Sequence, residues 1–334
     1  MKIFCVTWAP FSRRMDEIAA ELKAERWDYC LLFKMKVLAP FRYLIMAFRT
    51  LIELFKRKPD VIIAQNPPVF LPITCWVYCL LARCTLIVDH HCIWSEKTIR
   101  YPLLSRVIRG LEGFIVKRAE LNTSPHDVWT EKLIELSHKK AKVITVIDYV
   151  EELPMKKVSR ERFCRTDYLV VYPGGTGPYE RPDVAIEAVK ELEGVTLVIT
   201  GKKEFLKRIL PHESDRIVFS GFLPDEEYFG LLREADVVLN ITDEPYTIPH
   251  FLYEVMAAGT PIISSWNLPI AKLFNGSIYL IEENSPENLK KAIIEMQRNR
   301  EEWVQKIRKL RDDLKRVRRD QIQELMDYIQ RKGS

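Results

Sequence analysis

The chain has 334 residues, of which 47% are apolar, 29% charged and 10% aromatic. It is more than twice as long as a typical domain of about 150 residues, and this much apolar material excludes a disordered chain. The formal net charge is only +5, so overall charge does not single out one class of partner. We therefore expect two folded domains with large cores.

Short β-branched runs alternate with longer helical patterns through the first half of the chain, as in parallel βαβ units. The predicted strands are 2–6, 61–65, 85–89, 121–123 and 142–146, and the predicted helices are 15–24, 43–55, 71–83 and 128–136. Several strands end in polar residues, including Gln65-Asn66 and Asp89-His90-His91. Because ligands bind beyond the carboxyl ends of parallel strands, we expect these tips to face one crevice.

A charged segment containing Pro154 interrupts the alternation at residues 151–166, and we interpret it as a linker. A second alternating series follows, with predicted strands at 168–172, 196–200, 217–219, 237–240, 261–264 and 277–280. After Ser285 the pattern is helical throughout. The prediction is an α/β protein with two Rossmann-like domains facing a cleft, arranged as 1–150, the linker, 167–285, and C-terminal helices over 286–334 that pack back toward the N-terminal domain.

The seven cysteines are odd in number and include no Cys-x-x-Cys pair. Cys75 and Cys79 lie one helical turn apart in an apolar run. This favours reduced, buried thiols in a cytosolic protein over a disulfide framework or a zinc site. The longest apolar stretch, 69–82, ends at Arg83 and is shorter than the roughly 20 residues that cross a bilayer. The chain opens on a strand pattern rather than a signal peptide.

The strongest local motif is Glu-x-Met-Ala-Ala-Gly-Thr-Pro, which begins at Glu254. A helix starting near residues 248–250 would present backbone N–H groups in its first turn, which is an arrangement that binds anions. Glu254 would lie about one turn inside, where a carboxylate can accept hydrogen bonds from two ribose hydroxyls. Gly259 is suited to ending the helix. Taken alone, Glu254 is equally compatible with a solvated residue on an ordinary helix.

This block and the strand 235–239 before it resemble the nucleotide-binding half of GT-B glycosyltransferases, particularly the large family-four group. The runs 172–177, 199–202 and 219–222 resemble that family's other C-terminal loops, in the same order. The resemblance implies a nucleotide diphosphate sugar donor. Arg181 and Lys202 would offset the diphosphate charge, amides near Thr247 and Ile248 would bind its oxygens, and Glu254 would hold the ribose. The implied donor-binding set is Gly175, Thr176, Arg181, Gly201, Lys202, Phe222, Tyr246, Thr247, Ile248 and Glu254.

One position departs from the family pattern. Retaining members carry a first Glu eight residues before the second, and here that position is Tyr246. Glu244 lies two residues earlier and would substitute only if the turn were reshaped, so retention or inversion stays open. No Asp-x-Asp metal motif is present, and we predict a reaction without metal or other cofactor.

In the first half, Gln65-Asn66-Pro67-Pro68 and Asp89-His90-His91 resemble the mannosyltransferase that acts on dolichol-linked chitobiose. A histidine at this strand tip contacts the donor sugar in GT-B enzymes, and an imidazole can exchange a proton near neutral pH. The predicted catalytic residues are therefore His91, His90 and Asp89. Which histidine faces the cleft stays open, because adjacent strand residues point in opposite directions.

The first loop suggests an acceptor site. Ser12 can cap the following helix, and Arg13 and Arg14 in its first turn oppose the helix dipole. This local cost indicates a purpose such as holding an acceptor phosphate, although plain surface arginines are the alternative. The predicted acceptor-binding residues are Ser12, Arg13, Arg14 and Asn66.

Residues 34–58 are basic, aromatic and amphipathic, with Glu53 as the one acidic residue. Such a segment binds anionic lipid head groups, whereas a core helix with a basic edge would give the same pattern. Nucleic acid is disfavoured because no binding motif accompanies the charge.

The predicted function is that of a hexosyltransferase that passes sugar from a nucleotide diphosphate sugar to a lipid-linked or other glycan acceptor. It would work in glycan biosynthesis as a peripheral protein on the cytoplasmic face of the membrane. Two alternatives remain: an epimerase of the same fold acting on the nucleotide sugar, and a non-catalytic sugar-nucleotide-binding subunit, which Tyr246 favours.

Overall fold

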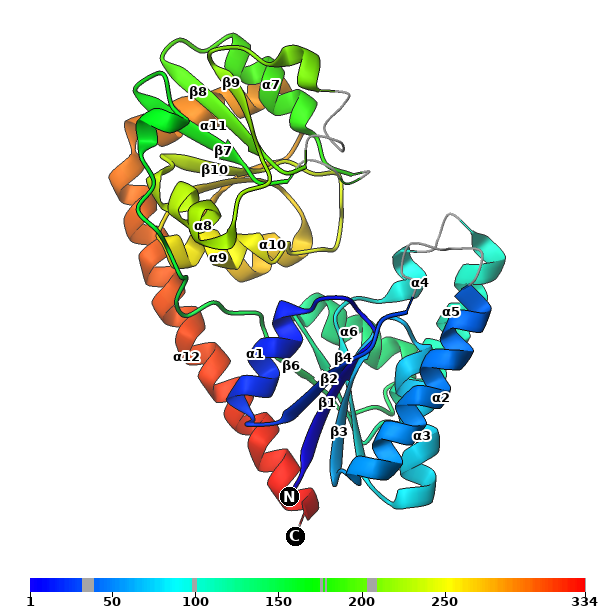
Figure 1. Ribbon diagram of the computed structural model, residues 1–334. Helices are drawn as coiled ribbons and strands as arrows, with labels where there is room; N and C mark the ends of the chain where they lie inside the picture. Colours follow the sequence, from blue (N-terminus) through cyan, green and yellow to red (C-terminus); the bar gives the residue numbers. More distant parts are fainter. Residues whose placement is uncertain (32–38, 98–100, 175–176, 178, 203–208, 334) are drawn as a thin grey trace. The chain divides into compact units, whose positions relative to one another are not determined.

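The computed structural model describes residues 1–31, 39–97, 101–174, 177, 179–202 and 209–333. The chain forms two compact units (Figure 1). The first unit comprises Met1–Asp148 with Arg318–Ser334, and the second comprises Tyr149–Val317. Each unit is built on its own six-stranded sheet, and the pairs between neighbouring strands are parallel.

The sheet of the first unit has the strand order β2-β1-β3-β4-β5-β6. Its strands are β1 (Ile3–Thr7), β2 (Glu25–Asp28), β3 (Val61–Asn66), β4 (Thr85–His90), β5 (Leu121–Ser124) and β6 (Val143–Thr145). Its helices are α1 (Arg13–Glu21), α2 (Ala39–Arg57), α3 (Phe70–Ala82), α4 (Trp94–Lys97), α5 (Pro102–Arg118) and α6 (Asp127–Leu136).

Alternating side chains of the first sheet enter two separate cores. Phe4 and Val6 pack in the core that contains residues of α2, α3 and α5. Cys5, between them, packs in the other core with residues of α1 and of the C-terminal helix. This period of two, which the sequence shows as buried β-branched runs, places helices on both faces of the sheet.

The predicted strands of the first half are confirmed to within two residues at each end, but β2 and α5 were not predicted. β2 reads Glu-Arg-Trp-Asp and lies at the edge of the sheet, with no side chain fully buried. It therefore lacks the apolar alternation that marks a buried strand. In α5, the exposed Leu103, Leu104 and Val107 obscure the amphipathic pattern.

The sheet of the second unit has the order β12-β11-β10-β7-β8-β9. Its strands are β7 (Tyr168–Tyr172), β8 (Val195–Thr200), β9 (Ile217–Gly221), β10 (Val237–Asn240), β11 (Ile262–Ser265) and β12 (Tyr279–Ile281). The helices between them are α7 (Pro182–Lys190), α8 (Asp225–Glu234), α9 (Phe251–Ala258), α10 (Leu268–Phe274) and α11 (Pro286–Arg298). The strand order reverses between β7 and β10, which is the point where open α/β sheets bind ligands.

The long helix α12 (Arg300–Gly333) contributes to both units, because its residues up to Val317 belong to the second unit and the rest to the first. Ile322, Leu325 and Ile329 are buried in a core of the first unit. Arg318 is also buried there, and its guanidinium binds Glu21 and the carbonyl of Ile147.

The expectation that the cysteines are all reduced is wrong. Cys79 and Cys84 form a disulfide, with their Cα atoms 4.8 Å apart. Cys79 lies in the last turn of α3, and Arg83 then adopts a left-handed backbone conformation that turns the chain back. The short separation produced by this turn falls in the range that disulfides require. Cys75 is buried with a free thiol.

None of the helices in the described ranges combines the length and the apolar composition needed to cross a membrane.

Residues 156–158, in the segment interpreted from sequence as a linker, pack across α8 at Gly230. A Cβ atom at position 230 would overlap the Lys156 carbonyl oxygen and lie 2.6 Å from Val158 Cγ2. A Cβ atom at Gly110, in α5, would meet no heavy atom within 4 Å. An alanine at Gly230 would therefore test close packing, whereas an alanine at Gly110 would test helix propensity alone.

We expect Gly230→Ala to lower the free energy of unfolding by about 1–3 kcal/mol, because the added methyl group must displace backbone. Gly110→Ala should raise it by about 0.5–1 kcal/mol through helix propensity alone. Urea denaturation of both variants measures the two effects. Equal stabilisation by both substitutions would show that residues 156–158 do not pack on α8.

Candidate functional site

The tips of β7, β8 and β9 in the second unit are joined by hydrogen bonds from backbone amides. The Gly174 amide donates to Thr200 Oγ1 over 3.2 Å, and the Gly201 amide donates to the Gly221 carbonyl over 3.1 Å. Gly201 has a φ of +121°, and a Cβ there would lie 3.4 Å from the Gly174 carbonyl oxygen. A side chain at this tip would be strained, so the glycine keeps bare backbone exposed at the strand ends. The predicted Gly175 and Thr176 lie outside the described residues.

Lys202 and Phe222, both predicted donor-binding residues, follow the tips of β8 and β9. Phe222 is 70% exposed, and Lys202 Nζ lies 5.9 Å from the centre of its ring. An exposed ring supported by its own strand end is suited to stacking against a base. Lys202 forms no ion pair with any residue in the described ranges, so its charge is available to a diphosphate.

The turn between β10 and α9 is held in place by three polar side chains. Asn267 Nδ2 donates to the carbonyls of Glu244 and Thr247, at 3.2 and 3.0 Å. Asn284 Nδ2 donates to the Thr242 carbonyl at 3.0 Å, and Ser265 Oγ accepts from the Thr242 amide at 2.9 Å. The predicted residues Tyr246, Thr247 and Ile248 are thus half-buried on a fixed turn. None of the holding residues was predicted.

Helix α9 begins at Phe251, slightly later than expected, with His250 as its N-cap. The amides of Leu252 and Tyr253 bond to the carbonyls of Pro249 and His250. The expected row of free amides is therefore shorter than the sequence indicated, although the Ile248 amide donates to no group in the described part of the chain.

Glu254 is buried, with 4% of its surface exposed, and it lies in the first turn of α9. One of its carboxylate oxygens is 4.0 Å from His250 Nε2. The alternative of a solvated glutamate on an ordinary helix is therefore wrong, because almost none of the Glu254 surface reaches solvent.

The structure changes the interpretation of Arg181. Its guanidinium binds Asp183 on α7 and Asp243 in the turn, with nitrogen–oxygen distances of 2.9 and 3.2 Å. The Asp183 and Asp243 carboxylates raise its pKa above the ordinary arginine value. Because two carboxylates already neutralise it, Arg181 is not the free cation that the sequence predicted for the diphosphate.

A buried tyrosine joins the two strands at the switch point. Tyr172 OH donates to the Ile241 carbonyl at 2.7 Å and contacts Glu180 Oε2 at 3.1 Å. Burial raises the pKa of Glu180, and the charge of nearby Glu244 raises it further, while the bond from Tyr172 lowers it. Sequence reasoning missed Glu180, whose only signal was its place directly before Arg181.

In the first unit, a buried ion network joins three distant segments. Arg14 on α1 binds both carboxylate oxygens of Asp89 at the tip of β4, at 2.8–3.1 Å. It also binds Asp148 and the Val146 carbonyl, both at 2.6 Å. Burial alone would raise the pKa of Asp89, but Arg14 and a hydrogen bond from Thr123 hold it below its ordinary value.

Two predictions for these residues are consequently wrong. Arg14 is 2% exposed, and its side chain is fully engaged by protein groups, so it cannot hold an acceptor phosphate. Asp89 and Asp148, rather than a ligand, neutralise its positive charge in the first helical turn. Asp89 is fully buried, so it acts as the partner of Arg14 and not as a group that touches substrate.

His90 is also fully buried, and both of its ring nitrogens have protein partners. Nδ1 lies 3.1 Å from Asn66 Nδ2 and Nε2 lies 2.9 Å from Asn122 Oδ1. Because Asn122 Nδ2 donates to the Val116 carbonyl, its Oδ1 is the acceptor and His90 carries the proton on Nε2. Burial lowers the pKa of His90 to about 4, which corrects its prediction as a catalytic residue.

Asn66 is likewise a buried structural residue rather than an exposed acceptor contact. Its Nδ2 lies near His90 and donates to Glu112 Oε1 at 3.4 Å. The backbone carbonyl of Asn66 accepts from the His91 amide. Glu112 in turn accepts from the amides of Trp94 and Ser95. This network orders the start of α4, and the sequence offered no signal for Glu112.

His91, Arg13 and Ser12 complete the predicted set. His91 is exposed, so the side chain that reaches solvent at this strand tip is the second histidine. Arg13 is half-buried and lies over the Phe11 ring, 5.7 Å from its centre. Ser12 caps α1 as predicted, accepting from the Met15 amide at 3.3 Å, and is buried.

No cluster of three or more His, Cys, Asp and Glu side chains suited to a metal ion occurs in the described ranges.

The whole chain has the fold of solved GT-B proteins. HepE of Anabaena, crystallised with UDP-glucose, matches with a TM-score of 0.73 and 13% identity, over 99% of this chain and 98% of that one. Sucrose-phosphate synthase of Thermosynechococcus elongatus matches with a TM-score of 0.73 and 12% identity, over 98% and 96%. The predicted GT-B architecture of two parallel-sheet α/β domains with C-terminal helices is confirmed.

Residues 156–316 match the family described as Glycosyl transferases group 1. A curated relative is the Bacillus subtilis protein named "Putative glycosyltransferase YtcC", which is 25% identical over 158 residues. The match covers 42% of this chain and 39% of the length of that relative.

Protonation of His90 provides a test of the buried network. Its pKa falls from 6.5 to about 4 on folding, so the unfolded chain binds this proton first as the pH drops. As the pH falls from 6.5 to 4, the His90 imidazole should therefore lower the free energy of unfolding by ~3 kcal/mol. Guanidinium denaturation across this range should show a shallower pH dependence for His90→Gln than for the parent protein.

The matched control is His138→Gln, which changes an exposed histidine in the same unit and should keep the parent slope. An unaltered slope in His90→Gln would contradict the burial of His90.

Proposed function

We propose that the protein is a glycosyltransferase that moves a sugar from a nucleotide diphosphate sugar, held mainly by the second unit, to a lipid-linked glycan acceptor. The observation that carries this proposal is the buried Glu254 carboxylate in the first turn of α9, the helix that follows the fixed turn after β10. The match of residues 156–316 to the group 1 family supports it, as does the similarity in fold to HepE, which was crystallised with UDP-glucose.

The second unit would bind the donor through three kinds of contact. Glu254 accepts hydrogen bonds from the ribose hydroxyls, and Phe222 stacks on the base. Lys202 and the Ile248 amide stabilise the negative charge that grows on the diphosphate as it leaves. Fixed dipoles and a cation can supply this stabilisation, which is the main chemical requirement of the transfer, without a metal ion.

His91 is the candidate for contact with the reacting sugar or the acceptor. It is exposed at the end of β4, and Asp89, fixed two residues earlier by Arg14, lies within electrostatic reach of it. An imidazole at this position can hydrogen-bond a hydroxyl or exchange a proton with it.

We expect Glu254→Gln to weaken binding of UDP-glucose by about tenfold or more, because hydrogen bonds to a charged group contribute about 1.5–3 kcal/mol. A thermal-shift panel of UDP, UDP-glucose and GDP-mannose on the parent protein identifies the tightest donor, and titration of that donor measures the loss. Net release of nucleoside diphosphate in the presence of a lipid-linked acceptor then separates a transferase from an epimerase and from a binding subunit.

Glu287→Gln is the matched control, because Glu287 is also in the first turn of a helix of the second unit but is exposed. Equal donor affinity in Glu254→Gln and Glu287→Gln, with both proteins folded, would refute the assignment of Glu254.

The first unit carries an unusually apolar outer surface on α2, α3 and α5, which lie side by side (Figure 1). We call it the three-helix face, and its apolar side chains, each at least 40% exposed, are Phe41, Leu44, Ile45, Phe48, Phe55, Val77, Leu80, Leu81, Leu103, Leu104 and Val107. On α2 these residues lie opposite the buried Met46 and Leu54, so this helix is apolar on both sides. A patch of this kind marks an interaction site.

The charges on these helices favour an anionic membrane as the partner. The basic residues of the three helices are Arg42, Arg49, Lys56, Arg57, Arg106, Arg109, Lys117 and Arg118. The acidic ones are Glu53 and Glu112, and Glu112 is buried. A basic, apolar face binds anionic lipid by burying side chains and attracting head groups together, which would bring the enzyme to an acceptor whose tail stays in the bilayer.

The double variant Leu44→Ser, Phe48→Ser should bind anionic vesicles at least about tenfold more weakly, since each buried large side chain contributes about 1.5–3 kcal/mol. Co-sedimentation with vesicles of phosphatidylglycerol and phosphatidylcholine measures this loss. Trp266→Ser, which changes a 52% exposed apolar residue of the second unit, should bind as the parent does. Vesicle binding that survives the double variant would exclude the three-helix face as the docking surface.

A further inference from the structure

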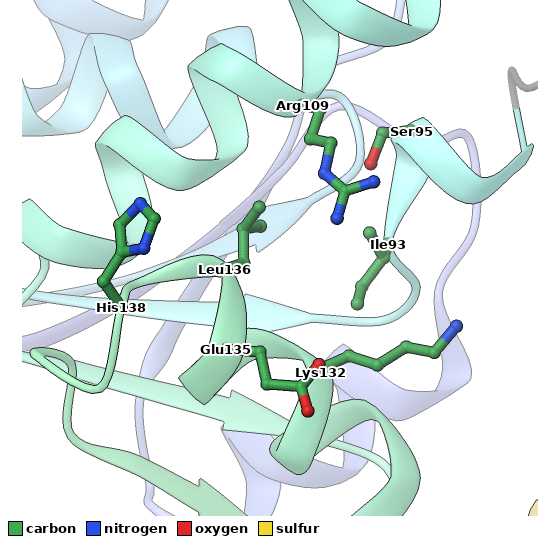
Figure 2. A pocket seen from close by; sticks show the side chains of 7 residues that line it. All are labelled: Ile93, Ser95, Arg109, Lys132, Glu135, Leu136 and His138. Carbon is green, nitrogen blue, oxygen red and sulfur yellow. The ribbon is translucent and has the colours of Figure 1, made fainter.

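A pocket of about 410 Å³ lies in the first unit, and its lining includes none of the predicted donor-binding, acceptor-binding or catalytic residues (Figure 2). Its lining residues come from the region of α4, from α5, and from α6 and the turn after it: Ile93, Ser95, Arg109, Lys132, Glu135, Leu136 and His138. The volume falls within the range of small-molecule sites.

The packing of α5 against α6 sets the position of the pocket. A Cβ atom at Gly113 would lie 3.5 Å from the Leu136 carbonyl oxygen, so the two helices come into contact at this point. Arg109 and Lys132 stand one helical turn before these two residues, one on each helix. The close contact at Gly113 therefore brings Arg109 and Lys132 into the lining of one pocket, where Lys132 Nζ also lies 5.1 Å from the centre of the Trp129 ring.

The charge of the lining is mainly positive. Two cationic side chains, Arg109 and Lys132, and one carboxylate, that of Glu135, line the pocket. In Figure 2 the Arg109 guanidinium points toward the space between Ser95 and Leu136. It has no hydrogen-bond or ion-pair partner in the part of the chain that the structure describes.

The wall on the α4 side combines an apolar residue with a hydrogen-bonded one. Ile93 is 3% exposed, and Ser95 is held by its hydroxyl, which donates to Glu112 Oε2 at 2.6 Å. The buried network around Glu112 thus fixes one wall, and Ile93 with Leu136 offers an apolar surface for the organic part of a ligand.

We propose that this pocket binds a phosphate ester, with Arg109 as the main phosphate contact and Lys132 as the second cation. A guanidinium presents a planar fork of donors that matches two phosphate oxygens, whereas an ammonium acts as a point charge. Both the unpartnered fork of Arg109 and the cation surplus favour a phosphate over a neutral ligand. Glu135 at the edge would disfavour a large polyanion.

The position of Arg109 suggests where the phosphate comes from. The same helix, α5, carries Leu103, Leu104 and Val107 of the three-helix face. A phosphate of an acceptor whose lipid tail lies in the bilayer would be delivered on the side of the unit that meets the membrane. This identification rests on the proposed function, whereas the phosphate site itself does not.

Titration calorimetry with inorganic phosphate and with glycerol 3-phosphate tests the site. We expect Arg109→Gln and Lys132→Gln each to weaken both ligands at least fivefold, and the double variant to abolish binding. Arg106→Gln, which removes an exposed arginine of α5 outside the pocket, should bind as the parent does. Parent protein that binds neither ligand, or Arg109→Gln that binds them as the parent does, would overturn the proposal.

Vesicles distinguish the two sources of phosphate. Phosphatidic acid offers a phosphate monoester in the bilayer, and phosphatidylglycerol offers a diester of similar charge. A preference for phosphatidic acid that Arg109→Gln removes supports a lipid phosphate. Loss of glycerol 3-phosphate binding without any change in vesicle preference supports a soluble phosphate ester and overturns the lipid source.

The thermal shift with UDP-glucose, measured on the same variants, should be unchanged because the donor residues belong to the second unit. Failure of the phosphate site would therefore leave the donor assignment standing, and a missing donor response would leave the phosphate site standing.

Discussion

The strand tips of the first unit depend on the buried guanidinium of Arg14. It joins α1 to Asp89 at the end of β4 and to Val146 and Asp148 after β6. Removing one partner of such a pair leaves an uncompensated buried charge, which costs about 3–5 kcal/mol. The network therefore holds three segments in one arrangement, and the exposed His91 is positioned because its neighbour Asp89 is held.

The second unit reaches the same result with neutral groups. Asn267, Asn284 and Ser265 hold the turn before α9 through its backbone. The Tyr172 hydroxyl, at the end of β7, donates to the Ile241 carbonyl directly after β10. A turn fixed before the ligand arrives loses little conformational freedom on binding, so more of the contact energy remains for the ligand. In both units, buried polar residues act as supports, and a few exposed or inward-facing groups are left for chemistry.

The family resemblance was sound where the motif specified a local structure. Glu254, Gly259 and the strand before them form a contiguous helix and its flanking turns, so short-range spacing determines their geometry. The resemblance misled at Asp89 and His90, and the helix-dipole argument misled at Arg14. Residue type and local position do not reveal whether a partner from elsewhere has already engaged the side chain. The prediction that Arg181 is a free cation was wrong for the same reason, since Asp243, 62 residues later, pairs with its guanidinium.

The sequence by itself determined the two α/β domains, most of their strands and the helix that carries Glu254. Buried strands repeat apolar residues with a period that packing on a sheet requires, and that signal is local. Tertiary structure alone decided which of His90 and His91 reaches solvent, which cations keep their charge available, and that Arg109 and Lys132 share a pocket. These outcomes depend on contacts between segments far apart in the chain, such as Gly113 against Leu136, and burial and ion pairing at such contacts have no signature in the neighbouring residues.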